Sequence, residues 1–424
     1  MGMTGAHGHC KRAAVASLMN LPEPQIPAAR FLDRRSPPKI VTLTLLAGLS
    51  ALTMNIFLPS LPGMAAWFNV PYAWMQSSVA LYLVFQAVLQ VVIGPISDRY
   101  GRRRVVLGAL VLFLVFTLGT LFAPNAQVFL VFRMAQAVVA TGMVLSRAIV
   151  RDMVPDDQAA SMIGYVTMGM SLVPMIGPAI GGVLDQAFGW RASFSLLFAL
   201  GVVVLALCWA DLGETAPQNR HSFAGQLRQY PGLLGAPLFW GYALSAAFAS
   251  GAFFAYLGGA PFVGNQIFGL SSTQIGLLFA ITAVGYASGN FFAGRFSVRV
   301  GINQMVLIGN LITFVGLGVL TLLTLLHLSG PVVFFGLTIT MGFGNGVALP
   351  NANAGMLSVR PDLAGSASGL GGSIMLGGGA ALAAVAGTIL KPGATELPLV
   401  LLMLGSALAS VAAILLVMQR TRPL

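Results

Sequence analysis

Residues 40–97 read IVTLTLLAGLSALTMNIFLPSLPGMAAWFNVPYAWMQSSVALYLVFQAVLQVVIGPIS and contain no Asp, Glu, Lys or Arg. A helix that crosses a membrane needs about 20 apolar residues, so this stretch is long enough for two crossings and a connecting turn. Pro71 marks the turn between them. Uncharged stretches of similar length cover residues 229–294 and 300–359. The repetition of such stretches predicts a chain that crosses a membrane many times.

The composition supports this interpretation. Only 8% of the 424 residues are charged, whereas 57% are hydrophobic. A soluble protein carries about 25% charged residues, and so few charges cannot cover the surface of a folded core of this size. The composition therefore argues against a soluble enzyme, a nucleic-acid-binding protein and a disordered chain. A membrane β-barrel is excluded as well, because its strands alternate polar and apolar residues.

Twelve membrane-spanning helices are predicted, and they make an all-α membrane protein. The spans are 40–62, 74–97, 105–123, 126–150, 160–184, 191–210, 237–259, 273–294, 303–326, 332–354, 365–389 and 397–418. The polar segment 212–236 divides them into an N-terminal half (39–211) and a C-terminal half (237–424), and residues 1–38 form a predicted disordered cytoplasmic tail. The pair Gly94 and Gly101 recurs as Gly294 and Gly301, an offset of 200 residues. We therefore expect two pseudo-symmetric six-helix halves, an arrangement found in secondary transporters.

The distribution of positive charge predicts the orientation. If the N-terminal tail is cytoplasmic, 19 of the 22 Lys and Arg residues fall in cytoplasmic segments. Because Lys and Arg concentrate on that side of a membrane, both termini are expected there, and the net charge of +11 implies no nucleic-acid partner. Cys10 and Cys208 imply no disulfide framework. His7, His9 and Cys10 could suggest a metal site, but no further ligands follow, so neither metal nor cofactor is predicted.

The loop after the second predicted helix reads GPISDRYGRRR, residues 94–104. Its glycines permit tight turning, and its aspartate is an anion at a membrane boundary, suited to an arginine or to a helix N-terminus. One interpretation is a gate between the two halves. The alternative is a solvated loop whose positive charges only set the orientation. The candidate residues are Gly94, Asp98, Arg99, Gly101 and Arg102.

Arg133 is a charge within the apolar span of the fourth predicted helix. A buried charge there costs a few kcal/mol at least, so it needs a partner or a function. The alternative is that Arg133 extends to the nearer membrane surface, since it lies about seven residues, roughly 10 Å, from the outer helix end. The functional interpretation is favoured. Asp152, at the other end of the same helix, is a further candidate for coupling.

The fifth predicted helix contains VPMIGPAIGG, residues 173–182. Its prolines remove backbone donors and bend a helix, and its glycines allow close contact between helices. This combination suits a hinge between the halves, although plain small-residue packing in a membrane bundle is the alternative. The candidate residues are Pro174, Gly177, Pro178 and Gly181.

These segments resemble those of a known family. The loop at 94–104 resembles the signature loop of the major facilitator superfamily, and residues 173–182 resemble its antiporter motif, with Val173 in place of the leading glycine. With NIFLPSLPGMA (55–65), SRAIVRD (146–152) and GWRASF (189–194), the chain is similar to the Bcr/CflA group of drug-resistance exporters. The resemblance implies a role for Arg133 in proton coupling or substrate handling. It also implies a latch between Asp98 and the N-terminus of the eleventh helix, near Gly365 and Ser366.

One departure from the family concerns the first helix. Relatives typically carry an acidic residue where this chain has Asn55, which neither binds a proton nor attracts a cation. All eleven Asp and Glu residues lie in loops, tails or helix ends, so Asp98 or Asp152 would have to carry a proton. A cavity without central acids favours neutral or anionic substrates over cations. The polar residues expected to line it are Asn55, Tyr82, Gln86, Gln136, Tyr256, Asn345 and Asn353.

Two functions remain open. The first is a proton antiporter that exports small drug-like or metabolite molecules from a bacterial cell across its inner membrane, acting as a monomer. The second is a facilitator or exporter of amino acids or other metabolites without tight proton coupling. A membrane enzyme is discounted, because the only adjacent acids are Asp156 and Asp157 and such enzymes need clustered acids or His pairs at a membrane face.

Overall fold

The structure is a computed structural model that describes residues 31–154, 162, 166, 173, 176–216, 230–360, 363–391 and 393–421. Every regular element in this part of the chain is helical. The first half comprises α2 (Ile40–Asn55), η1 (Leu58–Ser60), α3 (Leu61–Trp67), α4 (Tyr72–Tyr100), α5 (Arg102–Leu121), α6 (Ala126–Ala135), η2 (Gln136–Val139), α7 (Ala140–Met153) and α9 (Arg191–Asp211). Residues 176–188 are also helical and belong to the predicted fifth span.

The second half begins after the short helix α11 (Tyr230–Leu234). It comprises α12 (Pro237–Phe262), η3 (Val263–Ile267), α13 (Ser272–Val300), α14 (Ile302–Leu325), α15 (Pro331–Val359), α16 (Ala364–Ile389) and α17 (Leu397–Thr421). Within the described residues, eleven helices are long and apolar enough to cross a membrane. The remaining predicted span, 160–184, lies mostly outside the described residues. The expected polytopic all-helical fold is thus confirmed.

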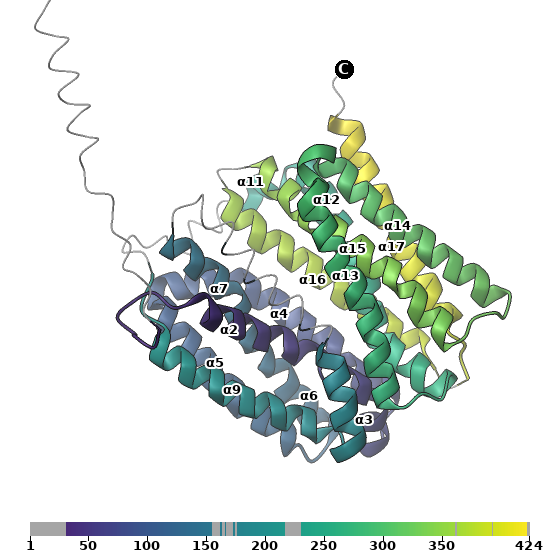
Figure 1. Cartoon of the computed structure of the whole chain (residues 1–424), viewed down its shortest axis with the longest axis horizontal. Coiled ribbons are helices and arrows are strands. Elements are labelled where there is room, and N and C mark those ends of the chain that lie inside the picture. Colours follow the sequence, from purple (N-terminus) through teal and green to yellow (C-terminus); the bar gives the residue numbers. More distant parts are fainter. Residues whose placement is uncertain are drawn as a thin grey trace, which may run out of the picture.

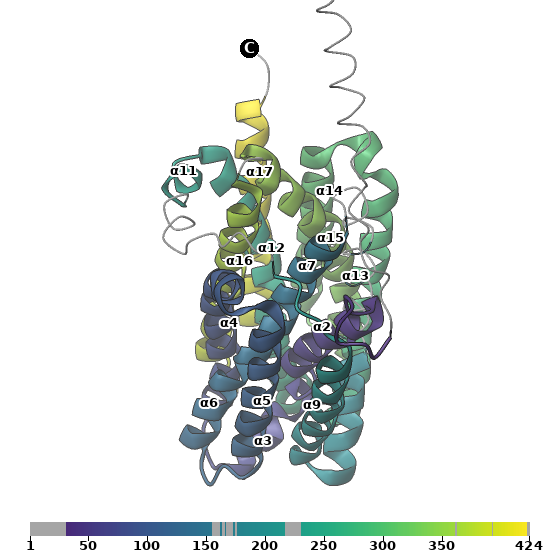
Figure 2. The same cartoon turned by 90° about the vertical axis from the view of Figure 1, so that its left-hand side faces the viewer.

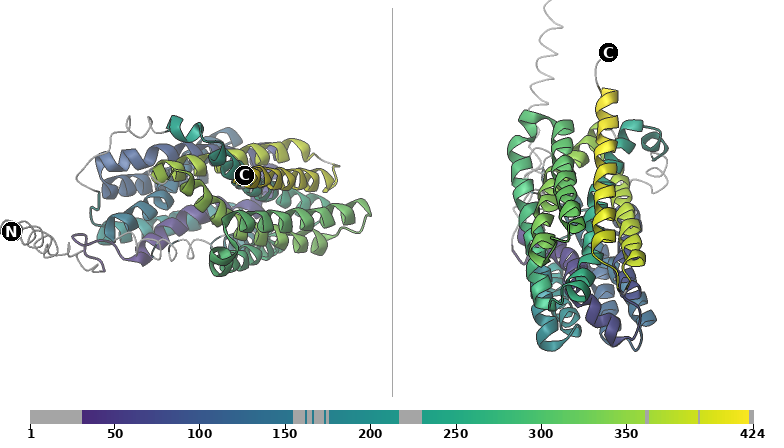
Figure 3. Two further views of the ribbon diagram at one scale, coloured as in Figure 1. Left: turned by 90° about the horizontal axis from the view of Figure 1, so that it is seen from above. Right: turned by 90° about the vertical axis from the view of Figure 1, so that its right-hand side faces the viewer.

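The two halves form two bundles that lie side by side (Figure 1). The start of α2 and the end of α17 point to one end of the molecule, which we call the terminal side, and α3 lies at the opposite end, the far side (Figure 2). The last helix, α17, runs the length of the second bundle and faces the viewer in the right-hand view of Figure 3. It packs there against α12 and α14.

The internal repeat is visible in the backbone. Helices α4 and α13 have the same length, 29 residues, and their positions differ by 200. Each ends at a glycine with positive φ: Gly101 has φ +95° and Gly301 has φ +92°. In both turns the glycine N–H donates to a serine carbonyl at 2.9 Å, Ser97 or Ser297. Because residues with a Cβ rarely adopt this backbone conformation, the repeated glycines are explained by the repeated turn.

Among the described helices, α4 and α16 make the main contact between the halves and run antiparallel. Ser373 of α16 donates to the Ala87 carbonyl of α4 at 2.8 Å, and the side chain of Gln76 donates to the Ala383 carbonyl. At the far side, the Tyr72 hydroxyl donates to the Gly258 carbonyl at 2.6 Å. Each of these bonds ends on a backbone carbonyl rather than on a charged group.

Candidate functional site

Arg133 lies in the last turn of α6, immediately before the 3-10 segment η2. Its side chain is fully buried, and its guanidinium carbon lies 4.2 Å from the ring centre of Phe57 and 4.3 Å from that of Tyr82. It donates to the Thr53 carbonyl and to Oε1 of Gln136, each at 2.9 Å. The arginine therefore points into the bundle between α2 and α4, and the alternative that it extends to the membrane surface is wrong.

The charge of Arg133 is stabilised by aromatic faces and dipoles. Among the described residues no carboxylate pairs with it, since the ion pairs found there all involve Arg102. Gln136 uses its amide nitrogen to donate to the Thr117 hydroxyl at 2.8 Å, which fixes the carbonyl that receives Arg133. Cation–π contacts of a desolvated guanidinium are worth about 2 kcal/mol or more each. The cluster leaves a net positive charge inside the first half.

Several of the predicted cavity residues carry buried polar atoms that find no hydrogen-bond partner among the described residues. They are Oδ1 of Asn55, the hydroxyl of Tyr82, Oε1 of Gln86 and Oδ1 of Asn345. Oε1 of Gln90, one helical turn beyond Gln86 on α4, belongs to the same class. A buried unsatisfied acceptor costs about 1–3 kcal/mol, so this many of them is unusual unless a ligand or water completes them.

The remaining predicted cavity residues lie in other surroundings. Gln136 is committed to Arg133 and Thr117. The Tyr256 hydroxyl accepts from Thr282 at 3.3 Å, and its ring packs among Phe279 and its neighbours in the core of the second half. Asn353 is exposed on α15. The structure therefore places Tyr82 and Gln136 in direct contact with Arg133. Asn55 and Gln86 lie in the same half, on α2 and α4, whereas Tyr256 and Asn353 lie in the second half.

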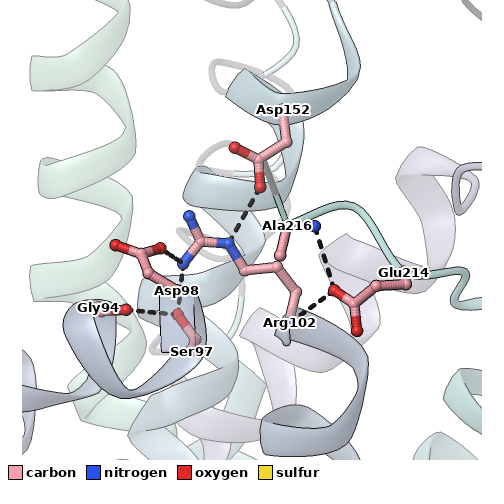
Figure 4. A network of polar contacts seen from close by, with 7 residues as sticks. All are labelled: Gly94, Ser97, Asp98, Arg102, Asp152, Glu214 and Ala216. Carbon is pink, nitrogen blue, oxygen red and sulfur yellow. Dashed lines mark hydrogen bonds and ion pairs between the residues drawn. The ribbon is translucent and has the colours of Figure 1, made fainter. Parts of the chain in front are cut away.

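A second polar cluster joins three segments at the terminal side (Figure 4). Nη1 of Arg102 lies 2.6 Å from Oδ1 of Asp98, and Nε of Arg102 lies 3.0 Å from Oδ2 of Asp152. Arg102 also donates to the Ser97 hydroxyl, which in turn donates to the Gly94 carbonyl at 2.7 Å. Arg102 is only 7% exposed. The loop after α4 is thus tied to the end of α7 by one buried arginine between two carboxylates.

Glu214 completes this cluster from the segment after α9. Its Oε1 accepts from the backbone N–H of Arg102 at 2.7 Å and from that of Ala216 at 3.1 Å (Figure 4). The carboxylate caps the first turn of α5, where the helix dipole favours a negative charge. The sequence analysis did not single out Glu214. Its position four residues beyond a predicted span was the available signal, but the pairing joins residues 112 positions apart.

The other loop candidates have simpler surroundings. Arg99 is exposed and lies over the ring of Tyr100, 5.5 Å from its centre. The expected partner of Asp98, near Gly365 and Ser366, adjoins residues 361–362, which lie outside the described part of the chain. Ser366 already has an interaction partner, so it is not a free end waiting for Asp98. The latch between Asp98 and α16 therefore stays a prediction.

The described part of the fifth span packs between the two halves. A Cβ on Gly181 would collide with the Ile56 carbonyl of its own half, and one on Gly182 would collide with the Ser272 carbonyl at the start of α13. Thr273 donates to the Gly182 carbonyl at 3.1 Å. Gly177 lies beside Leu52 and Asn55, and the Pro178 carbonyl meets Gly276. Pro174 lies outside the described residues.

The sequence analysis also missed Asp211, the last residue of α9. Its side chain is fully buried, and it accepts from the backbone N–H groups of Leu32 (2.7 Å) and Lys39 (2.9 Å) and from the Thr42 hydroxyl (2.6 Å). These bonds hold residues 31–39 against the end of α9, although residues 31–38 belong to the predicted disordered tail. In the part of the chain that the structure describes, no group of three or more His, Cys, Asp or Glu side chains could hold a metal ion. His7, His9 and Cys10 lie outside the described residues.

Three comparisons place the chain among known proteins. The profile of the Major Facilitator Superfamily matches residues 43–384. Multidrug resistance protein D of Escherichia coli (strain K12) is 28% identical over 88% of this chain and 94% of its own length. The bicyclomycin resistance protein homolog of Haemophilus influenzae is 28% identical over 80% of this chain and 86% of its own. The fold is that of a solved D-xylose-proton symporter, with a TM-score of 0.71, 15% identity and coverage of 89% and 96%.

Proposed function

The chain belongs to the Major Facilitator Superfamily, with relatives of the Bcr/CflA drug-resistance type, and from this premise we propose that it exports small drug-like or metabolite molecules by proton antiport. In this proposal the halves at 39–211 and 237–424 rock about the central site and open it to each side in turn. The protein acts as a monomer in a bacterial inner membrane with both termini in the cytoplasm. The relatives and the fold are those of transporters rather than of an enzyme family.

The observation that carries the proposal is the buried Arg133, which lies against Tyr82 in a half that also holds other buried polar atoms without a partner among the described residues. Asn55, Tyr82 and Gln86 offer hydrogen bonds that nothing in the described chain completes. Small-molecule sites are mostly apolar with a few such polar groups. Because no carboxylate accompanies Arg133 among the described residues, the site repels a cation. We therefore propose neutral or anionic substrates.

Proton coupling would then involve the cluster around Arg102. Asp98 and Asp152 are the carboxylates bound to Arg102, and a proton on either one would weaken its ion pair and loosen the terminal side. One inward proton releases about 2.3 kcal/mol per 100 mV. At about 1.4 kcal/mol per tenfold, that supports roughly a 50-fold gradient of a neutral substrate.

The second candidate is a facilitator or exporter of amino acids or other metabolites without tight proton coupling. Asn55 favours it. Its side chain is 1% exposed in α2, at the place where relatives typically carry an acid, and it cannot hold a proton. The two candidates share the site and the alternating halves and differ only in whether proton and substrate movement are linked.

Proteoliposomes with an internal pH dye separate the two candidates. Under an imposed pH gradient, a neutral phenicol or a bicyclomycin-like compound is added and both proton flux and substrate movement are recorded. Antiport predicts proton movement that depends on substrate and is lost in Asp152→Asn. Substrate movement without proton movement would overturn antiport and leave the facilitator. Protein-free vesicles and Arg99→Gln, which removes an exposed charge of the same loop, are the controls.

A further inference from the structure

A small basic pocket lies where the segment before α2 meets the end of α9. It has a volume of about 240 Å³ and is lined by Leu32, Asp33, Arg34, Arg35, Trp209 and Ala210. This volume is below the roughly 300–1,000 Å³ of sites for drug-sized ligands. Trp209 lies two residues from the end of the span Arg191–Asp211, so the pocket opens at the boundary of the membrane.

The backbone that carries Arg34 and Arg35 is held in place by hydrogen bonds and by a close backbone contact. Asp211 holds the backbone at Leu32 and Lys39, and a Cβ on Gly213 would lie 3.1 Å from the Arg34 carbonyl, so the two backbones touch. Asp33 closes a turn by accepting from the N–H of Arg35 at 3.0 Å, an arrangement typical of aspartate. The positions of Arg34 and Arg35 therefore follow from folded backbone rather than from a loose tail.

Two arginines line the pocket, and a third, Arg103, is bonded to the backbone of its lining residue Trp209. Arg34 lies over the Trp209 ring, 5.5 Å from its centre, and Arg35 is exposed on the same turn. From α5, Arg103 donates to the Trp209 carbonyl at 2.8 Å while its Nε is buried without a partner. Among the described residues, no carboxylate forms an ion pair with any of the three. Asp33 is the one acidic side chain in the lining.

Apolar side chains border these charges. Phe31, Leu32 and Trp209 are 56%, 54% and 57% exposed. Exposed aromatic and apolar groups at a membrane boundary contact the acyl region, while Lys and Arg near them attract anionic headgroups. The positive charge of the pocket, its small volume and its position at the membrane boundary together suit the phosphate diester of a lipid headgroup whose acyl chains remain in the bilayer.

We propose that this pocket binds the headgroup of an anionic phospholipid from the adjacent leaflet, with Arg34, Arg35 and Arg103 as its ligands and Trp209 against the glycerol region. The bound lipid would join the segment before α2 to α5 and α9, three elements that already meet at Asp211 and Trp209. This inference requires only that the chain spans a membrane and is independent of what it transports.

Native mass spectrometry of the full chain in detergent tests the proposal. The protein is titrated with phosphatidylglycerol and with phosphatidylcholine of the same acyl chains. We expect preferential retention of phosphatidylglycerol. At about 1 kcal/mol for each basic residue near an anionic surface, the double variant Arg34→Gln/Arg35→Gln should weaken that retention about 30-fold. Arg295→Gln/Arg299→Gln, which removes two exposed arginines from the second half, should leave it unchanged.

A second variant keeps the test decisive if the double variant folds poorly. Asp33→Asn retains the oxygen that accepts from Arg35 but removes the negative charge, so retention of phosphatidylglycerol should rise about fivefold. Unchanged retention in Arg34→Gln/Arg35→Gln, or equal losses in both double variants, would overturn the site. If millimolar inorganic phosphate displaces the lipid, the pocket is a site for free phosphate, and the proposal that its ligand is a membrane phospholipid is overturned.

Discussion

The guanidinium of Arg133 lies 4.3 Å from the centre of the Tyr82 ring, in a part of the bundle where no described carboxylate neutralises it. Tyr82 and Phe57 cover it, and Thr53 and Gln136 accept its hydrogen bonds. The break in the fourth span, η2, begins three residues later at Gln136. A short 3-10 stretch within a helix often marks a functional hinge or local strain, and here it begins at the residue that accepts a hydrogen bond from Arg133.

Arg133→Lys should abolish most transport while the protein still folds. Lysine keeps the charge but not the planar group that stacks on two rings and donates to two oxygens. We expect transport in proteoliposomes to fall at least tenfold, with a melting temperature close to that of the unsubstituted protein. Arg191→Lys is a matched control, because Arg191 also lies by two rings, 4.8 Å from those of Trp67 and Trp190, at the far side. Equal losses in both variants would contradict a special role for Arg133.

Arg102 should matter more for stability than either carboxylate that it binds. Arg102→Gln leaves Asp98 and Asp152 without their cation, whereas Asp98→Asn or Asp152→Asn leaves the arginine one partner. Because these groups are partly exposed, we expect a loss of about 1–3 kcal/mol for Arg102→Gln and less for each Asn variant. Thermal unfolding in detergent measures the difference. Arg99→Gln should be neutral, and a larger effect from it than from Arg102→Gln would refute the assignment.

Gly101 and Gly301 offer a matched pair for the role of Glu214. Alanine at either position meets the same backbone strain of about 1–2 kcal/mol, since both have φ near +90°. At Gly101 the new Cβ would also lie 3.0 Å from Cδ of Glu214, whereas at Gly301 it meets open space. Gly101→Ala should therefore lower the free energy of unfolding further than Gly301→Ala, by about 1–2 kcal/mol. In a Glu214→Ala background this difference should vanish; if it persists, the cap is not its cause.

Asp211→Asn should release the segment before α2. The carboxylate accepts three hydrogen bonds from donors in residues 32–42, and an asparagine amide would place N–H groups against N–H groups. We expect trypsin to cleave after Arg34, Arg35 or Lys39 at least tenfold faster, with cleavage elsewhere unaltered. Limited proteolysis followed by mass spectrometry identifies the sites. Asp185→Asn, at the far side, is the control, and an unchanged cleavage rate in Asp211→Asn would show that other contacts hold the segment.

Much of the fold could be predicted because the membrane imposes length and polarity on each span. The predicted span 191–210 agrees within one residue with α9, and the offset of 200 residues between Gly101 and Gly301 reappears in two equivalent turns. The breaks inside spans could not be predicted in the same way. Residues 136–139 contain neither Gly nor Pro, so the 3-10 segment there follows from tertiary contacts of Arg133 and Gln136.

The candidate site was accessible to sequence reasoning only in part. A charge or amide in an apolar helix is conspicuous, which identified Arg133, Asn55 and Gln86. Pairings between distant segments left no such signal. Asp211 and Glu214 look like ordinary loop acids until the fold brings Thr42 and the N–H of Arg102 to them. Tyr256 was predicted to line the cavity but lies in the core of the second half. A tyrosine in an apolar helix can be a core residue when another side chain, here Thr282, donates a hydrogen bond to its hydroxyl.

Asn55→Asp tests the proposed preference for neutral or anionic substrates. The new carboxylate would stand at the end of α2, two residues from the Thr53 carbonyl and from Phe57, which both contact Arg133, and would supply the negative charge that the site lacks. We expect measurable transport of a lipophilic cation that the unsubstituted protein does not move, and weaker transport of an anionic compound. Asn310→Asp is the matched control: Asn310 is equally buried but donates to Ser245 in the second half, so it should alter stability and not selectivity. Cation transport by the unsubstituted protein at the rate of Asn55→Asp would refute the preference, because a site whose buried charge is Arg133 should exclude cations.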